Sequence, residues 1–288
     1  MKRMRIFIAT LFFCVNSYAQ YSSSYVSHSY DYKNGGKVTV LNMSRKDEKV
    51  KIKYFAAKDG NTSVYQRFLN WKYGKNIICY SSGTYMDDCD VSKSRPVGLC
   101  VDNGKLVNNT LTHDLDGFTI VYATGGMVAS NLKDKDLTIT YQDGTKKTIN
   151  IRDVFDRQIF VDWANKMSAT VFQTHLLAYK NQLLIKPWSE KTSNRRFIAV
   201  GKDNIGVLHH IIISTVAQLT LYDASVTAFN YIKSNYLLSD ITYMINVDPG
   251  CQDVYKVFNA DGSVESGTGF SGAYDIRNAA NLVVYYYE

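Results

Sequence analysis

One acidic side chain stands where a buried carboxylate is costly unless it is paired or takes part in chemistry. Asp248 directly follows residues 241–247, a nearly continuous apolar run that is typical of a fully buried strand. Such a carboxylate is expected to be paired or to take part in chemistry, and an arginine would be a reasonable partner. The candidate is Arg195, in the polar segment 193–196. The spacing leaves two interpretations equally open, a functional pair and a structural ion pair that fixes a loop.

A second group of polar side chains follows the compact apolar segment 76–80. Ser81, Ser82 and Thr84 come directly after this predicted strand, where a sheet presents side chains to a crevice. Asn246 lies near the end of the other buried strand. Because hydroxyl and amide groups bind polar substrates, we expect these four residues to line a pocket.

The chain has five histidines, and two of them are candidates for proton transfer. His175 lies just before a predicted strand. His209 and His210 are adjacent on another strand, so at most one can face a site, and we take His210 as the candidate. We expect His28 and His113 to be structural hydrogen-bonding groups. The spacing of the histidines indicates no metal site.

The elements that must position these residues are mostly strands, since polar and apolar residues alternate along much of the chain. Three segments instead repeat their apolar residues at helical spacing behind a capping residue. They begin after residues 59–63, at Asp153 and at Thr220. Asn103-Gly104 is a hairpin signal. The expected fold is α+β, a mixed and largely antiparallel sheet with about three helices.

The first residues have the pattern of a signal peptide. Lys2, Arg3 and Arg5 precede a short apolar run that ends at a small-x-small cleavage site. We therefore expect cleavage after residues 1–19, and residues 20–288 should form a single domain because no linker-like segment divides them. The protein would be exported to the periplasm or the extracellular space. It would keep no transmembrane anchor, because the apolar run is too short to span a bilayer.

Composition narrows the classes of partner. Of the 288 residues, 45% are hydrophobic and 20% are charged, which is typical of a globular protein. The net charge is +7, and loss of the three basic residues of the signal segment lowers it to +4. Since no dense Lys/Arg cluster marks a nucleic-acid footprint, we expect no nucleic-acid partner.

Four cysteines remain after cleavage, namely Cys79, Cys89, Cys100 and Cys251. An exported protein can form disulfides, and the first three cysteines are close in sequence, so a local bridge is the simplest expectation. The sequence does not choose among the three possible pairings. The lack of a CxxC motif argues against zinc, and nothing in the sequence indicates the lowered pKa that a cysteine nucleophile needs.

One glycine-rich segment, residues 267–272, fits the GxGxxG pattern of dinucleotide-binding loops. It follows an Asp-Gly turn, and only a short tail remains after it, so we interpret it as a plain loop. The sequence therefore requires no cofactor, and it leaves a role for a divalent cation undecided.

An ordered series of segments resembles the motifs of one family. They are residues 77–85, 96–99, 102–105, 174–181, 195–199 and 246–252. Their order and content are similar to the phosphodiester glycosidase family, the group of N-acetylglucosamine-1-phosphodiester alpha-N-acetylglucosaminidase and its bacterial secreted relatives. In this comparison Ser81-Ser82-Gly83 stands where the family has Asn-Gly-Gly. Arg195 and Asp248 match the family's Arg and Asp.

The resemblance implies the family's fold and an exported hydrolase that cleaves a sugar-phosphodiester or related glycan linkage. Asp248 would supply the carboxylate, Arg195 would neutralise the phosphate, and His175 or His210 would transfer protons. The motif glycines are mostly replaced, however, and Pro249 has no N–H to offer a phosphate. An alternative is therefore a family member that has lost catalysis and binds a cell-envelope glycan or a protein partner. A third interpretation is an envelope structural protein.

Overall fold

The computed structural model describes residues 25–29, 37–46, 49–134, 137–187, 191–247, 250–265 and 269–288. Three predictions fall wholly or partly outside this part of the chain: the signal peptide at residues 1–19, the carboxylate of Asp248 and the start of the glycine-rich segment. Within the described ranges the chain has three α-helices and mostly antiparallel sheets, so the predicted α+β class is confirmed. None of these helices is long and apolar enough to cross a membrane.

Each α-helix begins behind a polar capping residue. The helices are α1 (Val64–Trp71), α2 (Val154–Lys166) and α3 (Leu221–Ser234). Their caps are Ser63, Asp153 and Thr220, and each side-chain oxygen accepts a hydrogen bond from a backbone N–H of the first turn. Those N–H groups have no partner inside a helix, so the caps determine where the helices start.

The largest sheet has seven strands, and every neighbouring pair in it is antiparallel. In spatial order they are β1 (Tyr25–Ser29), β2 (Lys37–Ser44), β15 (Leu208–Thr215), β14 (Arg196–Lys202), β16 (Asp240–Val247), β12 (Leu176–Tyr179) and β13 (Gln182–Leu183). β16 lies inside the sheet, which explains its apolar run. Its last residue, Val247, pairs with Arg196 of β14.

Three smaller sheets complete the strands. The four-stranded sheet contains β17 (Tyr255–Val257), β4 (Asn76–Ser81), β18 (Leu282–Tyr287) and β3 (Val50–Phe55). The five-stranded sheet contains β6 (Lys105–Asn108), β5 (Cys100–Asp102), β11 (Thr170–Thr174), β7 (Gly117–Val121) and β8 (Met127–Asn131). A hairpin is formed by β9 (Leu137–Thr140) and β10 (Lys146–Ile149). The last strand, β18, lies between β3 and β4, so the end of the chain completes the four-stranded sheet.

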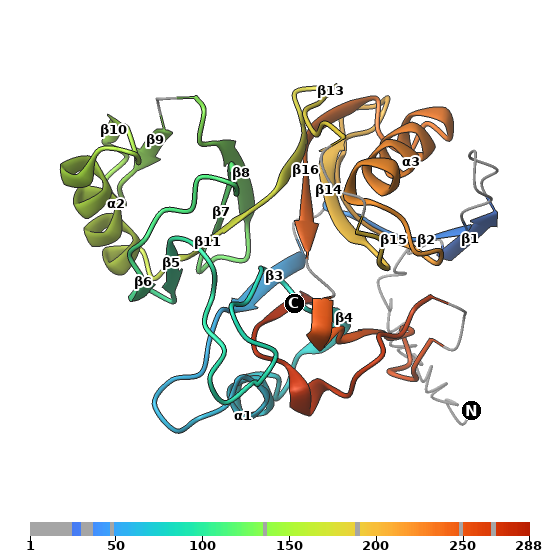
Figure 1. The fold of residues 1–288 in the computed structure, drawn as a ribbon, viewed down its shortest axis with the longest axis horizontal. Coiled ribbons are helices and arrows are strands. Elements are labelled where there is room, and N and C mark those ends of the chain that lie inside the picture. The colour runs from blue at the N-terminus through green and yellow to red at the C-terminus, as the bar shows by residue number, and fades with distance from the viewer. Residues whose placement is uncertain are drawn as a thin grey trace, which may run out of the picture.

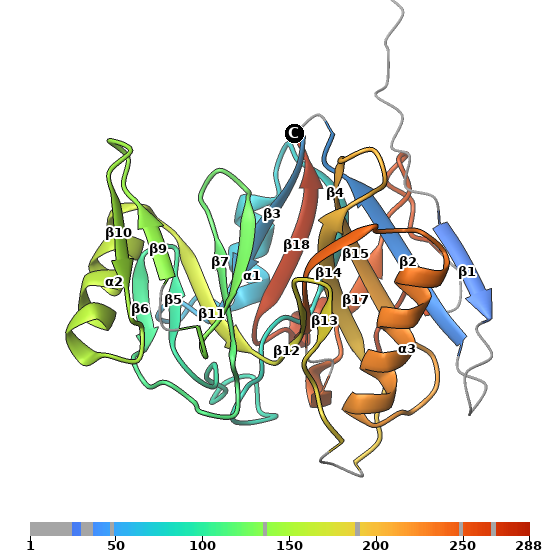
Figure 2. The same cartoon turned by 90° about the horizontal axis from the view of Figure 1, so that it is seen from above.

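The seven-stranded sheet is covered on both faces (Figures 1 and 2). One face packs against the four-stranded sheet, with Ile198 and Ile212 in the same apolar core as Tyr285. The other face packs against α3, where Ala199 lies in one core with Ala228. Because successive residues of a strand point to opposite faces, both faces of this sheet are apolar. Helix α1 covers the outer face of the four-stranded sheet.

The five-stranded sheet, α2 and the β9–β10 hairpin share a core of their own, at the left of Figure 1. Phe160 packs edge-on against Phe118 and at a tilt against Trp163 within it, with ring centroids 5.0 and 5.3 Å apart. β11 of this part leads directly into β12 of the seven-stranded sheet, and His175 is the single residue between them. This junction brings polar segments of both parts together.

Two tight turns have a left-handed backbone at both of their central residues. Asn103 and Gly104, between β5 and β6, have φ of 50° and 83°, as the hairpin signal predicted. Lys180 and Asn181, between β12 and β13, have φ of 49° and 64°. Asparagine and glycine tolerate this left-handed region, so short hairpins form at both places.

The disulfide joins Cys89 to Cys251, which are 162 residues apart along the chain, so the expected local bridge is wrong. Cys79 on β4 and Cys100 on β5 are free thiols in the apolar core between the sheets. Burial raises the pKa of both thiols, so neither is the thiolate that a nucleophile requires. The bridge ties the loop after β4 to the short 3-10 helix η1 (Gly250–Gln252) that follows β16.

Candidate functional site

The hydroxyl groups predicted after β4 lie together and are buried. Ser81 donates a hydrogen bond to the carbonyl of Ser82, at 2.9 Å, and Ser82 donates to the carbonyl of Gln252, at 2.6 Å. The Thr84 hydroxyl donates to the carbonyl of Gln173 on β11. These bonds hold the end of β4 against β11 and against the segment after β16. The hydroxyls of Ser82 and Thr84 thus tie separate segments of the backbone together, whereas the Ser81 hydroxyl donates to the next residue only.

A buried guanidinium meets Ser81, and it belongs to Arg196. Its Nη1 lies 3.3 Å from Ser81 Oγ and 2.9 Å from Asp253 Oδ1, and its Nε donates to Ser214 at 3.1 Å. The same group lies 4.0 Å from the ring centroid of Tyr255. The side chains of Arg196 and Asp253 are only 5% and 13% exposed, so the ion pair is largely removed from water.

Arg195, the arginine selected from the sequence, lies elsewhere. Its Nη2 and Nε donate to the carbonyls of Lys191 and Leu219, at 3.1 and 3.4 Å. Neighbouring residues on an extended chain point to opposite faces, so Arg195 and Arg196 cannot both contact Ser81. Arg195 is half-buried, and its charge acts on His175, where it disfavours protonation.

His175 is the titratable side chain at the junction of β11 and β12. It is half-buried, and its ring packs edge-on against Tyr85 with centroids 5.3 Å apart. Burial lowers the pKa of His175, and the carboxylates of Asp116 and Asp114 act in the opposite direction. The lowered pKa favours the neutral imidazole at pH 7, which is the form that accepts a proton.

Asn246 connects β16 to this histidine. It is 0% exposed, and its backbone N–H donates to the carbonyl of His175 at 3.0 Å. Its side-chain amide donates to the hydroxyl of Tyr85, and its backbone carbonyl accepts a hydrogen bond from the Thr174 hydroxyl. Its side-chain oxygen is buried and has no hydrogen-bond partner among the described residues. Asn246 thus orients Tyr85 and the backbone of His175. We call His175, Tyr85 and Asn246 the junction cluster.

His210 does not belong to this cluster, which corrects its assignment as a proton-transfer residue. It is 0% exposed, between the seven-stranded and four-stranded sheets, and its Nδ1 lies 3.1 Å from the hydroxyl of Tyr285. Burial lowers the pKa of His210 to about 3, with smaller effects of Arg45 and His209. A side chain enclosed in this way contacts no substrate, so His210 is a core residue.

Four residues in contact with the predicted side chains or with one another were not selected from the sequence, namely Tyr85, Arg196, Asp253 and Tyr255. Strand alternation shows that Arg195 and Arg196 point to opposite faces. The register of β14 on β16 is also needed to decide which of the two faces Ser81. Among the described residues no group of three or more His, Cys, Asp or Glu side chains is placed to hold a metal.

Comparison with known proteins shows a shared fold. No protein-family model and no curated protein sequence matches the chain. Among solved structures, it resembles the catalytic domain of zebrafish N-acetylglucosamine-1-phosphodiester alpha-N-acetylglucosaminidase, auto-inhibited by its pro-peptide, with a TM-score of 0.50 and 14% identity. The match covers 91% of this chain and 82% of that domain. A hypothetical protein from Synechocystis matches with a TM-score of 0.52 and 9% identity, over 92% of this chain and 62% of that one. The chain thus has the fold of this catalytic domain.

Proposed function

We propose that the protein is an exported hydrolase of the phosphodiester glycosidase type, which cleaves a sugar-phosphodiester or related glycan linkage. The observation that carries the proposal is the junction cluster, a half-buried neutral imidazole held by β11, β12 and β16 inside a fold shared with such an enzyme. The long-range disulfide supports export, because such bonds persist in oxidising compartments.

In this proposal His175 transfers the proton. Hydrolysis of a glycosidic bond needs a group that moves a proton to or from the reacting oxygen and a carboxylate near the sugar carbon. The neutral His175 can take a proton from water and then return it to a leaving oxygen. We assign the carboxylate to Asp248 from its position in the sequence, directly after Val247. Arg195, whose charge reaches His175, would attract the phosphate.

The proposal is tested with the purified mature chain and two substrates, a GlcNAc-1-phosphodiester and an aryl glycoside. His175→Gln and Asp248→Asn should each lower kcat/KM by about 10²-fold or more. His113→Gln, at an exposed histidine outside the junction cluster, is the matched control and should leave the rate unchanged. Turnover that survives both site substitutions would refute the assignment.

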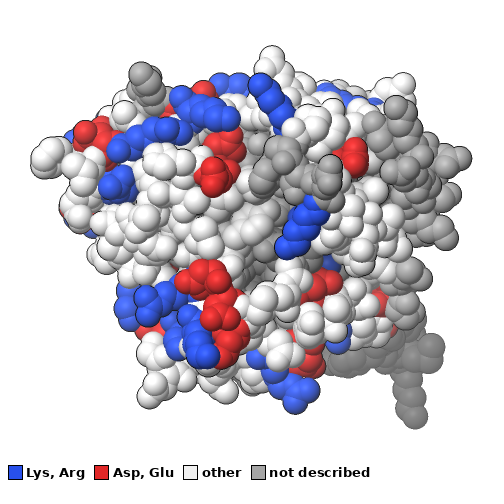
Figure 3. Space-filling model, viewed as in Figure 1, with Lys and Arg blue, Asp and Glu red and all other residues white. Residues whose placement is uncertain are grey.

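A second candidate function is glycan binding without catalysis, and three observations favour it. The hydroxyls of Ser81 and Ser82 donate to backbone carbonyls, and the charge of Arg196 is already neutralised by Asp253. Acidic side chains also gather below the middle of the face in Figure 3, and the disulfide-linked loop after β4 carries the exposed Asp87, Asp88 and Asp90. These acids would oppose a phosphodiester. Retention on a glycan array without any released product would support this candidate.

A further inference from the structure

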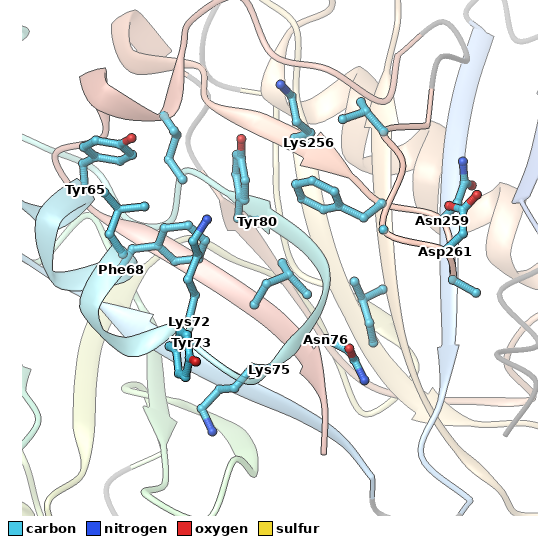
Figure 4. A pocket seen from close by; sticks show the side chains of 18 residues that line it. Tyr65, Phe68, Lys72, Tyr73, Lys75, Asn76, Tyr80, Lys256, Asn259 and Asp261 are labelled. Atoms are coloured by element: carbon cyan, nitrogen blue, oxygen red, sulfur yellow. The ribbon is translucent and has the colours of Figure 1, made fainter. Parts of the chain in front are cut away.

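A cavity lies on the far side of the four-stranded sheet from Ser81. It is a partly open cavity lined by α1, β4, β17 and the loop 258–264, and its volume is about 550 Å³ (Figure 4). On β4, Tyr80 packs against Phe68 of α1, whereas the next residue, Ser81, reaches Arg196 on the opposite face. A cavity of this volume is within the range of small-molecule sites, roughly 300–1,000 Å³.

Aromatic rings form much of the wall. Tyr80 lies at the centre, with its ring centroid 5.7 Å from those of both Phe68 and Phe258. Tyr65 stands beside them, and Tyr73 is 93% exposed at the rim (Figure 4). The C–H groups of a sugar ring pack well against such faces, and the tyrosine hydroxyls can exchange hydrogen bonds with sugar hydroxyls.

Amide groups add to this polar lining. Asn76, at the start of β4, and Asn259, in the loop after β17, both line the cavity (Figure 4). The Asn259 side chain donates one hydrogen bond to Ser263, which leaves its amide oxygen available as an acceptor. Amides that both donate and accept suit a ligand with many hydroxyl groups.

The charges of the wall are predominantly positive. Lys72, Lys75 and Lys256 line the cavity, against the single carboxylate of Asp261. Lys75 is paired with Glu288, whereas neither Lys72 nor Lys256 forms an ion pair with any residue in the described ranges. Neither lysine is held in an ion pair, although the carboxylate of Asp275 offsets part of the charge of Lys256, so Lys72 is the stronger attraction for a ligand anion.

We propose that this cavity binds an acidic saccharide, a sugar that carries a carboxylate or a phosphate group. A sugar ring packs on the half-buried Tyr65, beside Tyr80, which is only 6% exposed, and the acid group lies between the ammonium groups of Lys72 and Lys256. The site is separated from the junction cluster by the four-stranded sheet, so it stands whether or not the proposed hydrolysis is correct.

Isothermal titration calorimetry on the intact mature chain tests the proposal with three probes: trigalacturonic acid, glucose 6-phosphate and neutral maltotriose. At least one acidic probe should bind, and maltotriose should bind at least about tenfold more weakly. Lys72→Gln combined with Lys256→Gln should raise the Kd of the acidic probe by about tenfold or more. The matched control is Lys146→Gln with Lys147→Gln, the same loss of charge on the exposed β10 strand, and it should leave the Kd unchanged.

The three probes and the variants separate the outcomes. Preference for trigalacturonic acid or for glucose 6-phosphate identifies the acid group that the cavity takes. The proposal is overturned if neither acidic probe binds at millimolar concentration, if maltotriose binds as tightly, or if the pocket variant and the control behave alike. Lys72 is exposed, so Lys72→Gln alone should fold and still weaken binding if the double variant does not fold.

Discussion

Because His210 is buried, we expect the free energy of unfolding to fall in acid. The pKa of His210 in the folded protein is about 3, because burial between the two sheets disfavours the imidazolium. In the unfolded chain the pKa of a histidine is about 6.5. Above pH 6.5 the side chain is neutral in both states and contributes no pH dependence. Below pH 6.5 only the unfolded chain takes up the proton, so the free energy of unfolding falls as the pH falls, until about pH 3.

The magnitude follows from the difference between the two pKa values. Each pH unit in this window lowers the free energy of unfolding by about 1.4 kcal/mol. Between pH 6.5 and pH 4.5 the contribution of His210 is therefore about 3 kcal/mol, a large part of the roughly 5–15 kcal/mol by which domains are stable. His175, whose pKa is also lowered, acts in the same direction, so the wild-type curve alone does not isolate His210.

A variant isolates the effect. His210→Asn keeps an acceptor near the Tyr285 hydroxyl but cannot take up a proton in this range. Urea denaturation of both proteins, followed by circular dichroism between pH 7 and pH 4.5, measures the two slopes. The wild type should lose about 3 kcal/mol more than the variant. Parallel curves would show that His210 is solvated or already charged, and the reasoning from its burial would fail.

Two further predictions concern the cross-links around the site. Replacing Cys89 and Cys251 by serine should lower the free energy of unfolding by up to about 5 kcal/mol, because the bridge closes a segment of 162 residues. Urea denaturation would measure this loss. Four reactive thiols in the mature chain, denatured without a reducing agent, would contradict the bridge. Arg196→Met should destabilise the protein by about 3 kcal/mol, because it leaves the largely buried Asp253 without its charged partner and with only the Ala273 N–H as a donor among the described residues. Adding Asp253→Asn should restore part of that loss, and simple additivity of the two substitutions in urea denaturation would contradict a coupled pair.

Local features of the fold were predictable from the sequence because their physics is local. The caps Asp153 and Thr220 bond to their own first turns, and the Asn103-Gly104 turn depends on two residues. The apolar run of β16 indicated burial on both faces, which the sheet and its covering layers provide. The class of fold follows from such features, so it was within reach of the sequence.

The site was harder to predict, because its contacts join residues that are distant along the chain. Choosing Arg196 over Arg195 requires knowing which face of β14 meets Ser81, and that depends on how two sheets pack. The adjacency of His209 and His210 showed that their side chains diverge, but not that a second sheet covers His210. The partner of Cys89 likewise depends on where the segment after β16 returns.

The measurement that tests the central claim most directly is the pH profile of kcat/KM on a GlcNAc-1-phosphodiester. If His175 acts as the base, kcat/KM should rise with pH and reach half its maximum below pH 6.5, because burial lowers the pKa of this side chain. His175→Gln should abolish that limb together with most of the rate, while His113→Gln retains both. A rate and profile unchanged by His175→Gln, or no turnover in the wild type, would contradict the account.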